Sequence, residues 1–486
     1  MDDVCDAARA KLTNVVIQEA LVAPVNCGHA DAASDRGPDD GANGRIHTGC
    51  VAAAGEYADV LHHAAEYSHW GEGIRALQSE RMGVVGRCGT AASSRHVHAH
   101  AKMLHMKLVS VRESVPGERR ISLTPGVTKR LVGLGAEVQL ESGYGEANDV
   151  ADEVFVKAGA TFAPRADLLA GAEVLVGLNP PDVASLQALP EGAIVVSFLD
   201  PFRRGELVAL ARDRNLSTLV MELVPRTSYA QKMDALSSQA SLGGYAAVIT
   251  AADRSPKSFP MMSTPAGTIP PARVFVVGVG VAGLQAIATA KRLGARVEAY
   301  DTRPVVAEQV QSLGAKFVEL DVGETGQTEQ GYAKELTEEQ LAEQRRQMAK
   351  VVAGADVVIT TAQLFGRPAP RIIDAEMVSG MKPGSVIVDM AASTGGNVEG
   401  SVADEEVVVG GIRIVGFANL PGQVARDASE MYASNVFALI EHAWDRDANA
   451  LALTREGDEV LGGCLLTHAG AVLDARVAKS LPGGAA

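Results

Sequence analysis

The sequence predicts an α/β protein with two domains, each built around a parallel β-sheet. Two observations predict this fold class. From Met106 onward, short strands rich in branched apolar residues alternate with helical segments, and near residue 278 a glycine-rich turn joins one such strand to a helix. Strands that alternate with helices form parallel sheets that are covered on both faces. A length of 486 residues leaves room for two large domains and a tail.

Composition and charge limit the classes of partner. The chain is 47% hydrophobic and 21% charged, with a formal net charge of -15. Such a charge repels nucleic acids and anionic membranes, so we expect neither as the main partner. The most apolar stretch, residues 274–290, contains Gln285 and fits a buried strand, a turn and a helix start better than a membrane span. The acidic N-terminus lacks a signal-peptide pattern, so we expect a cytoplasmic protein.

Residues 1–105 differ in composition from the rest of the chain. They hold four of the five cysteines and nine of the eleven histidines, yet no Cys-x2-Cys pair and no histidine pair with zinc spacing. We therefore predict no metal site. The segment is expected to be a disordered tail or a non-native extension encoded upstream of the real start. We favour a start at Met103 or Met106, because "MKLVSVRES" begins at once with a strand pattern.

The first domain is predicted to cover residues 106–240. We expect strands at 107–111, 136–141, 173–178 and 193–199, and helices at 125–134, 150–159 and 181–188. A long helix begins near Asp234. Its Gly243–Gly244 pair predicts a closely packed neighbour, because each glycine destabilises an isolated helix by about 1 kcal/mol relative to alanine. Residues 265–272, "PAGTIPPA", are expected to form a stiff linker.

The second domain is predicted to cover residues 241–426, with residues 427–486 returning to complete the first domain. Its strongest signal is a strand at 274–277, a turn with Gly278, Gly280 and Gly283, a helix to about Leu293, and a strand at 296–300 that ends at Asp301. In this pattern Gly278 permits a tight turn, Gly280 lets the backbone approach a pyrophosphate, and Gly283 lets helix and strand pack closely. The pattern predicts a Rossmann-like domain that binds a dinucleotide; the alternative is a tight turn without a ligand.

The residues at the end of the second strand bear on which dinucleotide binds. Asp301 would accept hydrogen bonds from both ribose hydroxyls and repel a 2′-phosphate, which favours NAD(H). Arg303 is the contrary sign, since arginine at such a position can bind that phosphate. Two further strand-and-loop units follow, "GADVVITTAQLFGRPAP" and "PGSVIVDMAASTGGNVE". Between the halves of the domain, the first half of residues 321–345 is expected to be a mobile loop.

From Met106 to its end, the chain resembles the alanine dehydrogenase/nicotinamide nucleotide transhydrogenase family. Within that family it is most similar to the soluble NAD-binding component of the proton-translocating transhydrogenases. The resemblance covers about 380 residues, and the motifs that carry it are "RRISLTPGVTKRLVGLGAEV", "RTSYAQKMDALSSQASLGGYAAV", "GVGVAGLQAIATAKRLGA", "DTRPVVAEQVQSLGA", "GYAKE" and "KPGSVIVDMAASTGGN". It implies two Rossmann-like domains with the nucleotide in the cleft between them.

Chemistry separates the two branches of this family. An alanine dehydrogenase forms and hydrolyses an imine and needs groups that move protons, which its pattern supplies as a lysine, a histidine and an aspartate. This sequence has Gly177, Phe198 and Ser393 instead, and keeps only the arginine of that pocket, as Arg120. Hydride exchange between two nicotinamide rings needs no proton donor, only rings aligned at roughly 3–3.5 Å with water excluded.

The resemblance assigns roles to Arg226, Gln231 and Asp234, which we call the polar trio. They match three residues of the transhydrogenase loop that lies over the nicotinamide end of the nucleotide. Gln231 is implied to reach toward the ribose of the partner nucleotide, while Arg226 and Asp234 hold NAD(H) and the loop. Ser237 is implied to cap the carboxamide. The alternative for the trio is a surface loop in which Asp234 is a helix N-cap, and both roles can coexist.

The resemblance also implies a set of nucleotide contacts beyond the glycine turn: Val281, Asp301, Thr302, Arg303, Gly331, Gln344, Gln363 and Leu364. The segment around Tyr332 is implied to be a mobile loop that closes on the cofactor. Gln363 and Phe365 depart from the leucine and proline that are usual in the family. We therefore regard the contacts of that loop as less secure than the others.

These observations predict the NAD(H)-binding subunit of a proton-translocating transhydrogenase, active only with partners. NADP(H) and the membrane-spanning segments are expected on other chains, because this one ends soon after the soluble domain. The resemblance implies a homodimer and a cytoplasmic location at the inner (plasma) membrane, with attachment through the partner subunits. The alternatives are an alanine-type amino-acid dehydrogenase and a non-catalytic NAD(H) sensor.

Overall fold

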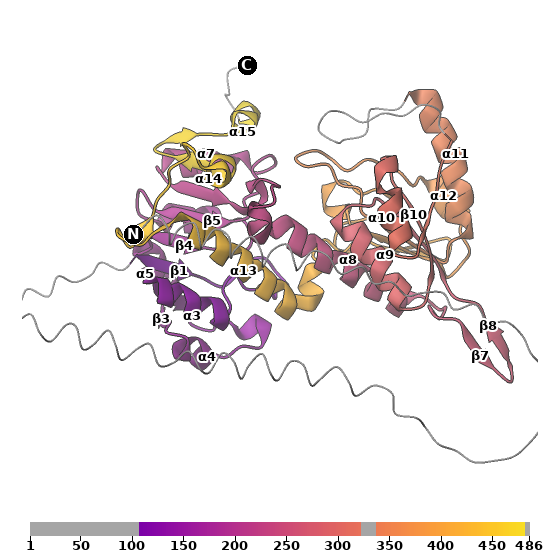
Figure 1. Cartoon of the computed structure of the whole chain (residues 1–486), viewed down its shortest axis with the longest axis horizontal. Helices are drawn as coiled ribbons and strands as arrows, with labels where there is room; N and C mark the ends of the chain where they lie inside the picture. Colours follow the sequence, from indigo (N-terminus) through magenta and orange to yellow (C-terminus); the bar gives the residue numbers. More distant parts are fainter. Residues whose placement is uncertain (1–105, 322–336, 482–486) are drawn as a thin grey trace, which may run out of the picture. The chain divides into compact units, whose positions relative to one another are not determined.

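The computed structural model describes residues 106–321 and 337–481, which lie within one compact unit of the chain. The extension at 1–105, Gly331 and Tyr332 fall outside the described residues, so the predictions for them stay predictions. In the described ranges the protein is an α/β structure with two main sheets (Figure 1), which confirms the predicted fold class. The division into domains at residues 240 and 426 stays a prediction.

The first sheet has the strand order β19-β18-β6-β5-β4-β1-β2-β3. The strands β1 to β6 are parallel, whereas β18 and β19 come from the C-terminal segment and pair in antiparallel fashion. The strands are β1 (Lys107–Ser110), β2 (Glu137–Glu141), β3 (Thr161–Ala163), β4 (Val174–Val176), β5 (Ile194–Ser197), β6 (Ser217–Val220), β18 (Leu465–His468) and β19 (Ala471–Val472). The associated helices are α3 (Pro125–Leu134), α4 (Asp152–Lys157), α5 (Arg165–Ala170), α6 (Val183–Ala188), α7 (Gly205–Asp213), α13 (Ala425–Ala443), α14 (Glu459–Cys464) and α15 (Ala475–Ser480).

The second sheet has the strand order β11-β10-β9-β12-β13-β15-β14, with β14 as its antiparallel edge strand. The strands are β9 (Arg273–Val277), β10 (Arg296–Tyr300), β11 (Lys316–Phe317), β12 (Val357–Thr360), β13 (Val386–Asp389), β14 (Glu406–Val409) and β15 (Ile412–Val415). The associated helices are α8 (Ala235–Arg254), α9 (Val281–Arg292), α10 (Ala307–Ser312), α11 (Glu338–Gly354) and α12 (Ala375–Ser379). Both sheets are therefore mixed rather than purely parallel, a common departure at the edges of such folds.

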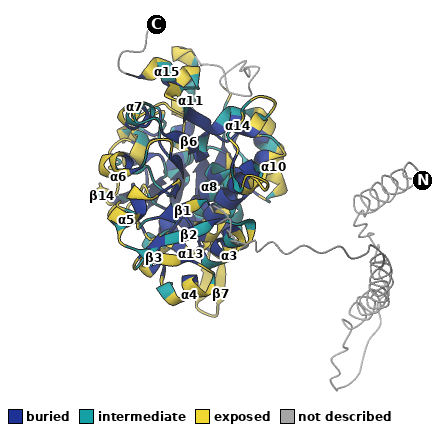
Figure 2. Cartoon of the chain, turned by 90° about the vertical axis from the view of Figure 1, so that its left-hand side faces the viewer, coloured by how far each residue is buried: buried dark blue, intermediate teal, exposed yellow. Residues whose placement is uncertain are grey.

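The side chains of the second sheet alternate between two hydrophobic cores. Val274 and Val276 of β9 pack on one face, together with residues of α8 and α9 such as Ala246 and Ala286. Phe275 of the same strand packs on the opposite face, with residues from α11 and α12. Successive side chains of a strand point to opposite faces, so a run such as "VFVV" is apolar throughout because both faces are covered. Figure 2 shows the buried residues gathered along central strands and α8.

Helix α8 links the parts of the fold that matter for the site. It contacts α13 of the first sheet's helices, and it also contacts α9 and β13 of the second sheet's layer (Figure 1). Gly244 explains the close contact with α9: a Cβ added there would overlap the carbonyl oxygen of Ala282. The prediction of a closely packed neighbour at the glycine pair is thereby confirmed.

The predicted stiff linker at 265–272 is wrong. β7 (Met262–Thr264) and β8 (Gly267–Ile269) form an exposed antiparallel hairpin there, with a 2.9 Å hydrogen bond between the hydroxyls of Ser263 and Thr268. The prolines of this stretch lie in the turn and after the second strand, so none of them removes an N–H group that the short ladder needs. Gly267 adopts φ 134°, which favours glycine.

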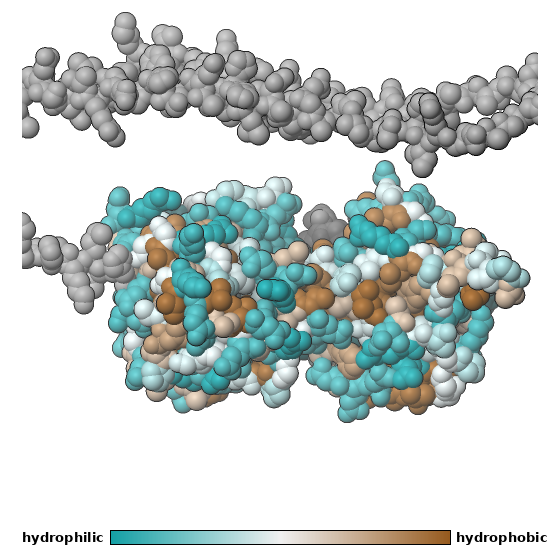
Figure 3. Space-filling view, turned by 90° about the horizontal axis from the view of Figure 1, so that it is seen from below, coloured by the Kyte–Doolittle hydropathy of each residue, from teal (hydrophilic) through white to brown (hydrophobic). Residues whose placement is uncertain are grey.

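The surface mixes polar and apolar side chains. On the face seen in Figure 3, hydrophobic residues lie in patches between hydrophilic ones. Within the described ranges, no helix is both long enough and apolar enough to span a membrane.

Candidate functional site

The carboxyl ends of four parallel strands define one edge of the second sheet. β9, β10, β12 and β13 run in the same direction, so the residues that follow them lie along this edge. They include Gly278 after β9, Asp301 after β10 and Thr361 after β12. Ligands of open α/β sheets bind outside the carboxyl ends of the strands. The sequence-predicted nucleotide residues therefore converge where such a fold places its ligands.

The glycine turn has the geometry of a backbone cradle. Gly278 adopts φ +93°, and a Cβ there would lie 2.7 Å from Thr361 Oγ1. A Cβ at Gly283 would overlap the carbonyl oxygen of Gly278, so both positions are fixed by internal packing. A Cβ at Gly280, in contrast, would meet nothing within 4 Å, so open space lies in front of the turn. The first N–H groups of α9, which begins at Val281, have no intrahelical acceptors and favour an anion.

Asp301 and Arg303 form a bidentate pair beside this turn. The guanidinium Nε and Nη2 of Arg303 donate to the two carboxylate oxygens of Asp301 at 2.9 and 3.0 Å. Asp301 Oδ2 also accepts from the backbone N–H of Val279 at 2.8 Å. Burial alone would raise the pKa of Asp301, but these hydrogen bonds and the charge of Arg303 hold it below its ordinary value. A ribose that binds Asp301 must therefore share or replace contacts that Arg303 already makes.

The other predicted nucleotide residues lie on neighbouring elements. Gln344 of α11 donates to the hydroxyl of Tyr300 at the end of β10. Gln363, in the loop after β12, donates to the carbonyl of Met390 at 2.8 Å. Leu364 and Thr302 are exposed.

The polar trio lies at the start of α8. Asp234 is the N-cap of this helix, and its carboxylate accepts from the backbone N–H of Ser237 at 2.9 Å and from its hydroxyl at 2.6 Å. Arg226 and Gln231 are exposed, and neither side chain has a hydrogen-bond or ion-pair partner within the described ranges. The capping alternative for Asp234 thus holds in the structure, while the other two side chains present free donors to solvent.

Helix α8 connects the trio with the glycine turn. Its N-cap is Asp234, and its Gly244 packs on Ala282 in the first turn of α9. Ten residues of α-helix rise by about 15 Å. In the described residues no hydrogen bond joins the trio directly to the glycine turn; the connection runs through the rigid helix.

A polar network occupies the carboxyl edge of the first sheet. Arg120 donates from Nε and Nη2 to the two oxygens of Glu118 at 2.9 and 2.7 Å, and from Nη1 to Gln239 at 2.9 Å. Glu118 also accepts from Asn179 and Asn419. Burial opposes ionisation of Glu118, but the hydrogen bonds and charge of Arg120 hold its pKa below the ordinary value.

The three positions that lack proton-handling groups surround this network. The carbonyl of Gly177 accepts from the Tyr432 hydroxyl at 2.8 Å, and the ring of Phe198 lies 5.3 Å from that of Tyr432. The carbonyl of Ser393 accepts from Arg203 at 3.1 Å. All three therefore make structural contacts, and a small carboxylate substrate would have to compete with Glu118 for Arg120.

The structure also contains residues near the site that the sequence argument did not single out. Asp389, at the end of β13, is fully buried and accepts from Thr360, Ala391 and Asn397, which shapes the loop after that strand. Asn397 also hydrogen-bonds both backbone groups of Ala362, next to Gln363. The signal for Asp389 is local, since a lone acid that ends an apolar strand at the carboxyl edge has to find partners once it is buried.

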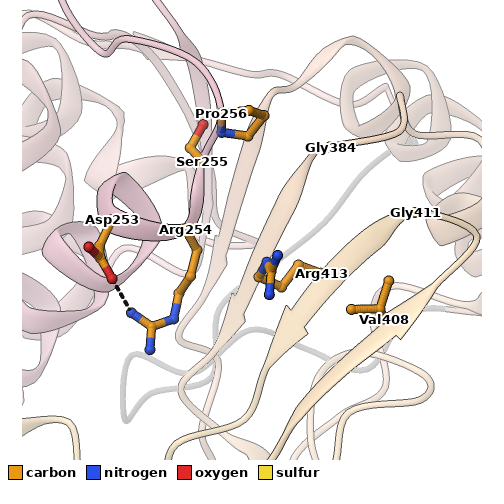
Figure 4. Close-up of a pocket in the computed structure, with 8 residues that line it drawn as sticks. All are labelled: Asp253, Arg254, Ser255, Pro256, Gly384, Val408, Gly411 and Arg413. Carbon is orange, nitrogen blue, oxygen red and sulfur yellow. Dashed lines mark hydrogen bonds and ion pairs between the residues drawn. The ribbon is translucent and has the colours of Figure 1, made fainter.

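A surface hollow lies elsewhere, at the opposite edge of the second sheet. It is lined by residues at the end of α8, before β13 and between β14 and β15, where Arg254 pairs with Asp253 (Figure 4). Arg254 and Arg413 also share Glu406. The hollow borders the amino ends of β13 and β15, so it is not the nucleotide site that the glycine turn indicates.

Comparisons with known proteins cover both sheets. The family model "Alanine dehydrogenase/PNT, N-terminal domain" matches residues 110–243, and "Alanine dehydrogenase/PNT, C-terminal domain" matches residues 247–475. The first of the polypeptides that make up NAD(P) transhydrogenase subunit alpha in Rhodospirillum rubrum is 44% identical over 376 residues, which cover 76% of this chain and 98% of that protein.

Solved structures give the same result. The transhydrogenase from Sinorhizobium meliloti matches with a TM-score of 0.66 and 40% identity, over 76% of this chain and 99% of that one. An L-alanine dehydrogenase matches with a TM-score of 0.65 and 23% identity, over 77% of this chain and 99% of that one, which shows the shared fold alone.

Proposed function

The chain belongs to the alanine dehydrogenase/PNT family, and from this premise we propose that it is the NAD(H)-binding subunit of a proton-translocating NAD(P) transhydrogenase. NAD(H) on this chain exchanges hydride with NADP(H) on a partner subunit, and membrane-spanning subunits carry the protons. Identity of 38–44% to curated subunits named NAD(P) transhydrogenase subunit alpha supports this branch of the family.

The residues present fit NAD(H). The open space at Gly280 and the N-terminus of α9 suit a pyrophosphate, and Asp301 provides carboxylate oxygens for ribose hydroxyls. Bound NADH would supply the hydride. Val281, Thr302, Gln344, Gln363 and Leu364 are proposed to line the rest of the nucleotide; Gly331 and Tyr332 belong to the same proposal.

One observation carries the proposal: beside a helix that packs on the glycine turn, Arg226 and Gln231 present unpaired polar groups, and Asp234 and Ser237 fix the helix start. Such a site can orient two nucleotides, which is what hydride transfer between nicotinamide rings requires. An amino-acid dehydrogenase also needs proton transfer, and Gly177, Phe198 and Ser393 have no side chain suited to that task in the places where the family pattern has lysine, histidine and aspartate.

The test is hydride transfer from NADPH to an NAD analogue, with the full chain mixed with a purified NADP-binding component. We expect turnover only in the mixture, a loss of about tenfold or more in the Gln231→Asn variant, and NADH affinity within twofold of wild type, because the amide is shortened by one methylene away from the NAD(H) cradle. Gln187→Asn, an exposed glutamine on α6, is the matched control and should leave turnover unchanged.

Two other outcomes would point to the rivals. NADH binding and complex formation without turnover would replace the proposal with an NAD(H) sensor. Reduction of NAD by L-alanine with the chain alone would replace it with an amino-acid dehydrogenase. The proposal also includes a homodimer and peripheral attachment to the inner membrane through the partner subunits, which sedimentation of the purified chain and co-fractionation with membranes would test.

A further inference from the structure

A chain of three polar side chains ends at the loop that carries the polar trio. The hydroxyl of Tyr229 lies 3.1 Å from His442 Nδ1, and the two rings meet edge to face with centroids 5.6 Å apart. His442 Nε2 lies 2.8 Å from Asp458 Oδ2. The other oxygen of Asp458 caps α14 by accepting from the N–H of Leu461 at 2.9 Å. Tyr229, two residues before Gln231, is thus tied to a helix start far along the chain.

The hydrogen-bond pattern fixes how the histidine is used. A carboxylate only accepts, so Nε2 of His442 carries the proton that faces Asp458. In the neutral ring Nδ1 is then an acceptor, and the Tyr229 hydroxyl donates to it. If the ring gains a second proton, Nδ1 donates and the hydroxyl accepts. The link to Tyr229 persists in both protonation states, which makes it a structural tie and not a pH switch.

A second tie starts from the same face of α13. Asn435 lies seven residues before His442, two helical turns away on one side of the helix. Its Nδ2 donates to the carbonyl of Lys232 at 2.9 Å, and its Oδ1 accepts from the Ser238 hydroxyl at 2.7 Å. Helix α13 therefore holds the trio-bearing loop on both sides of Gln231.

We propose that His442 and Asn435 are positioning residues that set where Gln231 and Arg226 present their side chains. The proposal rests on the proposed function. Since neither of these two side chains has a partner of its own in the described ranges, the place they reach follows from the backbone, and the backbone is held by α13. An error of about 1 Å in such a group is enough to slow a reaction up to about a hundredfold.

Two substitutions of His442 separate positioning from general support of the fold. The amide of His442→Asn takes the place of Nδ1 and can keep the contact with Tyr229, whereas that of His442→Gln takes the place of Nε2 and keeps Asp458. We expect Tyr229→Phe and His442→Gln to lower kcat for hydride transfer about fivefold to tenfold with the Kd for NADH within twofold, and His442→Asn to recover most of the loss. Tyr245→Phe, an exposed tyrosine of α8, is the matched control.

Amide hydrogen exchange keeps this inference separable from the proposed function. The N–H groups of Ala230 and Asp234 donate within the loop, to the carbonyls of Thr227 and Gln231 at 3.1 and 3.2 Å. His442→Gln should accelerate exchange at both about fivefold, and Tyr245→Phe should not. Unchanged exchange in His442→Gln overturns the positioning role, even if the wild type transfers no hydride. Unchanged kcat in an active wild-type background, or a loss in His442→Asn as large as in His442→Gln, overturns it as well.

Discussion

Glu222 shows at the level of one residue how a buried acid shapes the fold. Its Oε1 accepts from the backbone N–H groups of Leu199 and Asp200 at 2.8 and 2.5 Å, where the chain leaves β5. Its Oε2 is shielded from solvent and has no hydrogen-bond partner in the described part of the chain. Burial raises the pKa of Glu222 to about 7, against an ordinary value of 4.5, although the backbone N–H groups oppose this shift.

This raised pKa predicts a pH-dependent stability. Below pH 4.5 the carboxyl is protonated in both the folded and unfolded states. Between 4.5 and about 7 the unfolded chain releases the proton that the folded protein retains, so the free energy of unfolding falls as pH rises through this window and then levels off. The full loss is about 3 kcal/mol for a single group.

Chemical denaturation at pH 5 and pH 8 measures the effect as the difference in free energy of unfolding between the two conditions. Glu222→Gln should remove most of the difference, because the amide keeps an acceptor and cannot ionise. Glu153→Gln on the exposed side of α4 should retain it. An identical pH dependence in Glu222→Gln and the wild type would show that another group is responsible.

Residues with a local role were predictable, and those with distant partners were not. The glycines of the turn follow from backbone geometry, and the N-cap at Asp234 follows from its place before a helix. The pairing of Arg120 with Gln239, in contrast, joins positions 119 residues apart. Nothing in the neighbourhood of either residue encodes such a contact, because it depends on how α8 packs against the first sheet.

The same distinction holds for whole elements. β14 and β15 are joined by Gly410 and Gly411, both with positive φ, at 60° and 84°. A two-glycine turn between valine- and isoleucine-rich runs is a strong hairpin signal, so this element was predictable from its own residues. β18 and β19 carry no such signal for their place in the first sheet, where β18 pairs with β6, which precedes it by more than 200 residues.

The contact between α8 and α9 yields a prediction for a pair of helical glycines. Gly244→Ala should destabilise the protein by about 1–3 kcal/mol, because the new methyl group overlaps the Ala282 carbonyl. Gly133→Ala in α3 should stabilise it by about 0.5–1 kcal/mol, because nothing lies within 4 Å and alanine favours the helix. Urea denaturation measures both. A stabilising Gly244→Ala would mean that α8 and α9 separate at little cost.

For the whole molecule, the order of strands and helices predicted the fold class, and the glycine turn predicted which sheet presents a nucleotide edge. The approach of the two sheets' loops to each other could not be predicted. Phe202, after β5, meets Phe365, after β12, with ring centroids 5.4 Å apart, and the neighbouring Arg203 donates to the Ser393 carbonyl. Phe365 occupies a position where the sequence departs from the family pattern, and departures of this kind have no precedent in the resemblance that predicted the other contacts.

These loop contacts predict that NADH binding protects the loop at Phe202. Gln363 and Leu364, proposed nucleotide contacts, immediately precede Phe365, so a nucleotide that orders their loop also orders the partner of Phe202. Trypsin cleavage after the exposed Arg203 should slow several-fold when NADH is added, and Phe202→Ala should lose most of this protection. Arg476→Ala, which removes the cation stacked 5.9 Å from the Phe202 ring but leaves Phe365, is the matched control and should keep it. Equal protection in Phe202→Ala would mean that the nucleotide orders the two loops separately.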